Sequence, residues 1–218
     1  METSTLWTFG DSYTFGFACR EDCPSGKASS YMKYKKKDDD TWPNLLSRDL
    51  NFNLQNLGKN SYCNYDIIES IIDNIKNINQ DDIVVIFKTI PQRLKHPLND
   101  EWKFIPNDVL WQCYENDKGN EDFTKEQIKS IVPYYTEFFN QPAVKNRQNK
   151  IYNHLIDTIK SKKVKVVVEE ITEKEREKHQ TIEKHTNGEI YDFHFSYNGH
   201  QSFYKHIKSK LKLDKSIL

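Results

Sequence analysis

The sequence lacks several features that would place it in a simple class. Its 218 residues carry 32 basic and 32 acidic side chains, so the formal net charge is zero. Without a basic excess, the overall charge does not attract the chain to nucleic acid or to an anionic membrane. No apolar run approaches the length that crosses a bilayer, and no basic segment leads an apolar stretch at the N-terminus. We therefore expect no nucleic-acid partner, no membrane partner and no signal peptide.

Cysteine is also scarce. Its four positions, Cys19, Cys23, Cys63 and Cys113, are too few to form a disulfide framework in a chain of this length. Cys19 and Cys23 lie close together, but no second Cys or His pair follows at zinc spacing. We expect no metal and a reducing compartment, although a single bridge remains compatible with the count.

Alternating strand-like and helix-like segments are what the sequence does contain. The run IVVIF at residues 83–87 is continuously apolar, which is typical of a strand buried on both faces of a parallel sheet. Further strands are expected at residues 6–9, 52–54 and 164–168. Helices are expected after Thr41, from residue 65 to 78 with Asn64 as N-cap, from about 135 to 160, and from 201 to 211. This order predicts a doubly wound α/β fold with a mostly parallel sheet.

One stretch breaks the alternation. Residues 95–133 have no clean periodicity and contain three prolines among several aromatic side chains. A long irregular stretch in a compact domain is usually functional. We expect one domain spanning residues 1–218, with an insertion at about 95–133 beside the site.

The polar residues that follow the strands are the candidates for chemistry. Ligands of an open parallel sheet bind where loops leave the carboxyl ends of the strands. Ser12 follows the first strand, and a serine nucleophile needs a base and a group that orients the base. His194 is a candidate base, and Asp192 lies two residues before it in the same loop. The sequence therefore predicts a Ser-His-Asp triad.

The motifs around these residues resemble those of a known family. FGDSYTFG at residues 9–16, NLG at 56–58 with NSYCN at 60–64, and DFHFSYNGH at 192–200 resemble three blocks of the SGNH/GDSL hydrolases, a family of esterases and lipases. The resemblance spans nearly the whole chain. It implies a three-layer α/β/α sandwich with a flavodoxin-like sheet, and catalysis by Ser12, His194 and Asp192 without a cofactor. It also implies an oxyanion hole built from the amides of Ser12 and Gly58.

One block departs from the family pattern. Where the family usually has Gly-x-Asn-Asp, residues 87–93 read FKTIPQR, similar to a Thr-x-x-x-Arg variant of phage-borne and environmental members. Thr89 is the candidate third oxyanion donor. Arg93 is expected to orient the loop or to bind substrate. Asp11 is expected to shape the turn and to belong to the substrate-binding residues. A cytoplasmic or virion-associated location fits this resemblance.

The resemblance leads to one main function and two alternatives. The main expectation is hydrolysis of a short-chain acyl ester, such as an O-acetylated carbohydrate, with a small molecule or glycan as the partner. The first alternative is a non-catalytic carbohydrate-binding or virion-associated module on the same fold, because the third block is missing. The second is a metal-dependent phosphoesterase that uses Asp11, Asp192, His194 and His200. The sequence does not predict an oligomeric state.

Overall fold

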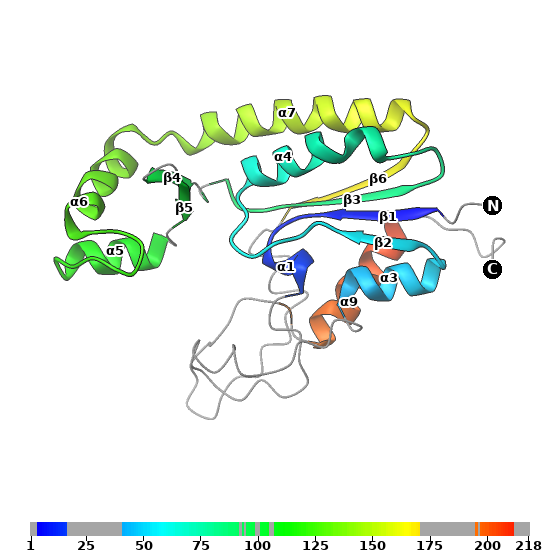
Figure 1. The fold of residues 1–218 in the computed structure, drawn as a ribbon, viewed down its shortest axis with the longest axis horizontal. Coiled ribbons are helices and arrows are strands. Elements are labelled where there is room, and N and C mark those ends of the chain that lie inside the picture. The colour runs from blue at the N-terminus through cyan, green and yellow to red at the C-terminus, as the bar shows by residue number, and fades with distance from the viewer. Residues whose placement is uncertain are drawn as a thin grey trace.

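A four-stranded parallel sheet forms the centre of the molecule (Figure 1). The computed structural model describes residues 4–16, 41–91, 93, 95–98, 101–104, 107–170, 195 and 197–211. The strands are β1 (Thr5–Phe9), β2 (Asn53–Asn56), β3 (Ile83–Lys88) and β6 (Lys165–Glu170), in the order β2-β1-β3-β6. The chain begins near the middle of the sheet and adds strands on both sides, which confirms the doubly wound architecture.

Helices cover both faces of this sheet, so the fold has three layers (Figure 1). One face carries α4 (Asn64–Asn74), with its 3₁₀ extension η2 (Ile75–Asn77), and α7 (Gln141–Ser161). The other carries α3 (Trp42–Leu50) and α9 (Tyr197–Leu211). The short helix α1 (Ser12–Phe15) follows β1 at the end of the sheet.

The apolar run of β3 explains why both faces are covered. Val85 and Phe87 pack with α3 and α9, whereas Val84 and Ile86 pack with α4 and α7. Successive side chains of a strand point to opposite faces, so a continuous apolar run needs a helix layer on each side. The prediction from residues 83–87 is confirmed.

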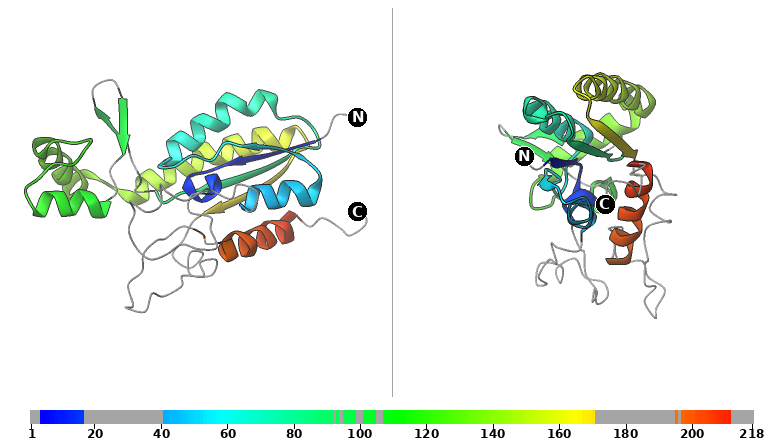
Figure 2. Two further views of the ribbon diagram at one scale, coloured as in Figure 1. Left: turned by 60° about the horizontal axis from the view of Figure 1, so that its bottom comes forward. Right: turned by 90° about the vertical axis from the view of Figure 1, so that its right-hand side faces the viewer.

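The segment expected to be an insertion contains its own regular structure. It consists of β4 (Lys95–Leu98) and β5 (Glu101–Phe104), which form an antiparallel pair, followed by α5 (Asn107–Glu115) and α6 (Lys125–Pro133). The π-helix η3 (Tyr134–Phe138) follows directly after α6. Leu110, Cys113 and Phe123 form a separate small core with Ile128 and Val132. These elements project beyond the end of the sheet at which β1 and β3 stop (Figures 1 and 2).

Three helix starts differ from the sequence prediction. The last helix was expected from residue 201, but α9 begins at Tyr197. The long helix was expected from about residue 135, but α7 begins at Gln141, where Asn140 Oδ1 accepts from the amide of Ala143 at 3.0 Å and Pro142 occupies the first turn. Asn64 was expected to cap α4, but Cys63 holds the N-cap position, and Asn64 is the first helical residue with its side chain buried. None of the described helices is both long and apolar enough to cross a membrane.

Candidate active site

The turn after β1 places Ser12 at the start of a helix. Asp11 is the N-cap of α1: its Oδ1 accepts from the amide of Tyr13 at 3.1 Å, and its main-chain oxygen accepts from Thr14 and Phe15 at 3.0 and 2.9 Å. These bonds use amides that a helix start would otherwise leave unpaired. Ser12 is therefore held in a fixed turn at the carboxyl end of β1, with 4% of its surface exposed.

Two glycines let neighbouring loops reach this turn. A Cβ at Gly58 would lie 2.6 Å from the amide nitrogen of Phe15, and a Cβ at Gly10 would lie 2.1 Å from Thr14 Oγ1. Both distances are far below van der Waals contact. Gly58 follows β2, so its lack of a side chain is what brings the loop after β2 against α1.

The amide of Gly58 already has an acceptor within the protein. It donates to Asn56 Oδ1 at 3.1 Å, and the same oxygen accepts from Thr8 Oγ1 at 3.0 Å. Asn56 Nδ2 donates in turn to the main-chain oxygen of Thr14 at 3.1 Å. Asn56 thus ties β1, α1 and the loop after β2 together. The oxyanion role of Gly58 remains a prediction, and it requires this amide to share its proton with Asn56 or to leave it.

Arg93 and Asp11 form an ion pair across the candidate site. Arg93 Nη1 lies 2.8 Å from Asp11 Oδ2 and 3.4 Å from the main-chain oxygen of Tyr62. The Asp11 side chain is completely buried and that of Arg93 is 19% exposed. The pair joins the loop after β3 to the turn that carries Ser12; whether Arg93 orients this loop or binds substrate stays a prediction. The substrate-binding role expected of Asp11 stays a prediction; in the structure its carboxylate is buried and both of its oxygens accept hydrogen bonds.

The same pair bears on the phosphoesterase alternative. That alternative needs Asp11 as a metal ligand, but a guanidinium on Asp11 Oδ2 competes with a cation for the same oxygen. His200 is completely buried, and its Nδ1 accepts from the amide of Trp42 at 3.2 Å, which anchors α9 to the start of α3. Among the residues that the structure describes, no group of three or more His, Cys, Asp or Glu side chains is arranged to hold a metal ion.

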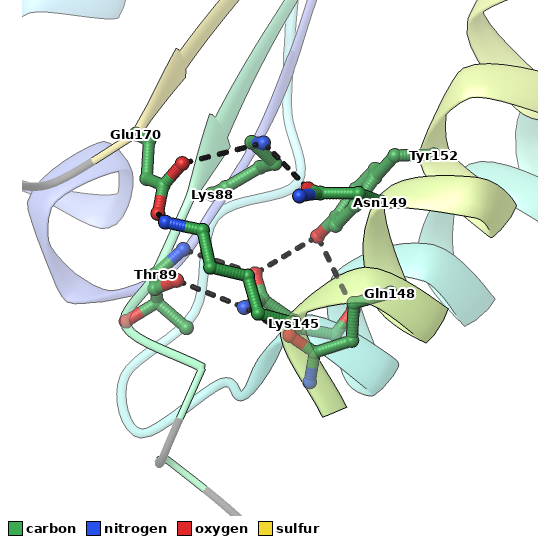
Figure 3. Close-up of polar contacts among 8 residues, drawn as sticks. Lys88, Thr89, Lys145, Gln148, Asn149, Tyr152 and Glu170 are labelled. Atoms are coloured by element: carbon green, nitrogen blue, oxygen red, sulfur yellow. Dashed lines mark hydrogen bonds and ion pairs between the residues drawn. The ribbon is translucent and has the colours of Figure 1, made fainter. Parts of the chain in front are cut away.

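Thr89 directly follows β3, and Asn64 holds its main chain. Asn64 Nδ2 donates to the oxygen of Thr89 at 2.8 Å, and the amide of Thr89 donates to Asn64 Oδ1 at 3.1 Å. The Thr89 hydroxyl points away from these bonds in Figure 3. None of the hydrogen bonds among the described residues uses this hydroxyl, and Thr89 as a whole is 2% exposed.

Two residues of α7 also form hydrogen bonds with Asn64 (Figure 3). Gln148 Oε1 accepts from Asn64 Nδ2 at 3.1 Å, and the Tyr152 hydroxyl lies 3.1 Å from Asn64 Oδ1 and 3.2 Å from the Asn64 main-chain oxygen. Burial raises the pKa of Tyr152 well above its ordinary value, so its hydroxyl keeps the proton that it donates. Gln148 Nε2 is buried with no hydrogen-bond partner in the described structure.

A charged group lies beside this network at the ends of β3 and β6. Glu170 forms ion pairs with Lys145 at 2.7 Å and Lys88 at 3.5 Å, and Lys88 also donates to Asn149 Oδ1 at 3.1 Å (Figure 3). The preceding residue, Glu169, pairs with His206 and Lys210 of α9. The carboxylates that end β6 are thus partnered by lysine and histidine side chains of α7, α9 and β3.

The C-terminal part of the predicted triad is only partly visible. Asp192 and His194 lie outside the described residues, so their roles remain predictions. Phe195, the residue after His194, is described and 2% exposed. Its ring packs edge-on against Tyr13, the residue after Ser12, with 4.9 Å between centroids, and also lies against Phe87 of β3. The sequence neighbours of the candidate base and the candidate nucleophile are therefore in contact.

No family model and no curated protein matches the sequence. Solved structures do resemble the fold. One is a carbohydrate esterase whose active site is described as displaying divergent catalytic and non-catalytic binding functions, with a TM-score of 0.46 and 12% identity over 100% of this chain and 70% of that one. Another is a member of the lipolytic protein G-D-S-L family from Veillonella parvula, with a TM-score of 0.40 and 14% identity over 96% and 100%. A third is the lipase/acylhydrolase from Enterococcus faecalis, with a TM-score of 0.37 and 15% identity over 98% and 100%. At these identities the likeness is one of general architecture.

Sequence reasoning missed the residues that hold the site together. Asn64 was assigned to a helix cap, and Gln148 and Tyr152 were not singled out. A usable signal existed for Asn64 alone, because it belongs to the Asn-rich stretch after Gly58 that was included in the second motif. Gln148 and Tyr152 lie 84 and 88 residues from Asn64 along the chain, and a local sequence pattern does not predict contacts over such a separation.

Proposed function

We propose that this protein is a serine esterase with Ser12 as nucleophile, His194 as base and Asp192 as the group that orients the base. The observation that carries the proposal is the contact between Phe195 and Tyr13. Each ring belongs to the residue directly after a candidate catalytic residue, so the packing brings the two chain segments to one place. The capped turn at Asp11 supports the proposal because it fixes the orientation of Ser12.

The proposed reaction is acyl transfer to water. Ser12 Oγ attacks the carbonyl carbon of an ester while His194 accepts the hydroxyl proton. The tetrahedral oxyanion then collapses, the carbon–oxygen bond to the alcohol breaks, and His194 returns the proton to the leaving oxygen. Water repeats these steps on the acyl-enzyme, which releases the acid and restores Ser12.

Three donors are proposed for the oxyanion. They are the amides of Ser12 and Gly58 and the hydroxyl of Thr89. Support for Thr89 is its position directly after β3 and the absence of any bond from its hydroxyl within the described structure. Removing one preorganised donor of this kind lowers kcat by about 10²–10³-fold. Thr89 would thus take the place of the missing asparagine in the third block.

A short-chain ester is the proposed substrate class, with an O-acetylated carbohydrate as the favoured member. The sequence contains no long apolar insertion that would bind an acyl tail. Five apolar residues of the 95–133 segment pack into a core of their own, whereas Trp111 and Tyr114 are exposed. A panel of nitrophenyl esters should therefore show the highest kcat/KM for acetate and lower values as the chain lengthens.

The test of the mechanism uses matched variants. Ser12→Ala and His194→Ala should each abolish release of nitrophenol from nitrophenyl acetate. Ser70→Ala on α4 and His154→Ala on α7 remove the same side-chain types away from the site, and both should retain wild-type turnover. A fluorophosphonate should label the wild type, with the adduct on Ser12 by mass spectrometry. Unchanged turnover in Ser12→Ala, or an adduct on another serine, contradicts the mechanism.

One observation favours a second candidate, a non-catalytic glycan-binding module. The amide of Gly58 is satisfied by Asn56, which is the state expected of an oxyanion hole that no longer operates. Binding of an acetylated glycan without release of acetate, and with unchanged affinity in Ser12→Ala, would select this candidate over the esterase.

A further inference from the structure

Asn64 grips the main chain of Thr89 at two points. Its amide group supplies one donor and one acceptor, and these meet the carbonyl oxygen and the amide of the same residue at 2.8 and 3.1 Å. Such a two-point contact fixes both the position and the rotation of a peptide segment. A side-chain amide presents a donor and an acceptor side by side, which matches the two main-chain groups of Thr89. Asn64 is 3% exposed, so water does not compete for these bonds.

The Asn64 side chain is in turn held by hydrogen bonds from α7. Tyr152 and Gln148 are one helical turn apart on this helix, and both contact the Asn64 side chain (Figure 3). The Tyr152 ring is 1% exposed and packs among the apolar residues of the core between the sheet, α4 and α7. Asn64 therefore has little freedom to rotate away from Thr89, because its oxygen and its nitrogen are both held by a buried helix.

The other end of the same loop is also anchored. Arg93 closes the segment after Thr89 by its ion pair with Asp11, in the turn that carries Ser12. With both ends fixed, the main chain at Thr89 has a defined orientation relative to Ser12. A β-branched side chain has few rotamers once its backbone is set, so the direction of the hydroxyl follows from the direction of the main chain.

We propose that Asn64 is a positioning residue that aims the Thr89 hydroxyl at the oxyanion, with Tyr152 and Gln148 holding Asn64 in place. This inference rests on the proposed esterase function. Asn64 makes no contact with substrate in this scheme, since both polar atoms of its side chain are used on Thr89 and α7. A hydrogen-bond donor displaced by a fraction of an ångström loses part of its effect on the transition state while substrate binding changes little.

The test is a double-mutant cycle that combines removal of the Thr89 hydroxyl with changes at Asn64 or Tyr152. Thr89→Val removes the hydroxyl and should lower kcat by about 10²-fold with little change in KM. Asn64→Ala and Tyr152→Phe, each made alone, should lower kcat by roughly tenfold. Made in the Thr89→Val background, the same changes should lower kcat by less than about twofold, because the hydroxyl they aim is already gone. Tyr152→Phe keeps the buried ring, so it carries the test if Asn64→Ala does not fold.

The control is Tyr65→Phe, which removes a hydroxyl from the partly buried residue next to Asn64; this hydroxyl bonds to neither Asn64 nor Thr89, so its removal should leave kcat unchanged. Equal losses from Tyr152→Phe in both Thr89 backgrounds would overturn the inference, as would full activity of Tyr152→Phe. Hydrogen exchange gives a second readout: the Thr89 amide should exchange faster in Tyr152→Phe than in the wild type. A wild type with neither turnover nor label on Ser12 overturns the proposed function itself, which is a different outcome from turnover with additive losses.

Discussion

Replacing Arg93 by methionine would test how the loop after β3 is joined to the turn that carries Ser12. The substitution keeps the length of the aliphatic stem and removes the partner of a completely buried carboxylate, Asp11. Removing one member of a buried pair typically costs 3–5 kcal/mol, and Arg93 is partly exposed, so we expect about 3 kcal/mol. In a chain of this size, roughly 2–4 °C of melting temperature corresponds to each kcal/mol, which gives a decrease of roughly 6–12 °C.

The double variant Asp11→Asn/Arg93→Met separates the pair from its surroundings. Asparagine keeps an oxygen for the amide of Tyr13 and removes the buried charge, so less than half of the single-variant penalty should remain. Urea denaturation and calorimetry of both variants measure the difference. Lys125→Met, which removes a partner of the exposed Asp117, is the control and should leave the unfolding midpoint unchanged. A double variant as unstable as the sum of its two single variants would refute the reasoning.

Two further predictions follow from ionisable groups near the site. Burial opposes ionisation of Glu170, but the hydrogen bond from Lys145 and the charges of Lys88 and Lys145 lower its pKa overall; the stability that these pairs contribute is therefore present at neutral pH and lost as the carboxyl is protonated. Urea midpoints of the wild type and Glu170→Gln should differ at pH 7 and converge below about pH 4, and a constant difference would contradict the pairing. Burial raises the pKa of the Cys63 thiol to about 11, so iodoacetamide at pH 8 should label Cys63 far more slowly in the native protein than in urea; similar rates would show that the thiol is accessible.

The parts of the fold that could be predicted are those with a local cause. The run at residues 83–87 determines a strand that needs cover on both faces, and Val84 and Val85 do point to opposite layers. Gly58 was expected near the nucleophile, and its missing side chain does allow the close approach to α1. Where a second local cause intervened, the prediction shifted: Pro142 and the cap at Asn140 start α7 later than its apolar pattern indicated.

The site depended on contacts that local patterns do not contain. Asn64 is of a residue type that favours the N-cap position, because an asparagine side chain commonly accepts from a nearby amide at a helix start. In the structure Cys63 holds the N-cap position. The Asn64 side chain instead forms hydrogen bonds with the main chain of Thr89, which lies 25 residues away at the end of β3. Asp11 meets Arg93 across 82 residues. Neither partner is specified by spacing, because the parallel sheet brings the strand ends together only after both crossovers have folded.

These long-range contacts divide the motif residues into two kinds. Asp11, Asn56 and Asn64 have their polar side-chain atoms bonded within the protein, so their chemistry is used to hold loops. The Thr89 hydroxyl carries no such bond in the described structure, although the main chain of Thr89 is held at two points by Asn64. A rigid main chain that presents an uncommitted donor is the arrangement that electrostatic stabilisation of an oxyanion requires, since the donor then needs no reorganisation when charge develops. The main chain at Thr89, within residues 87–93, therefore has the rigidity that such a donor needs. The double-mutant cycle tests whether the Thr89 hydroxyl acts as that donor.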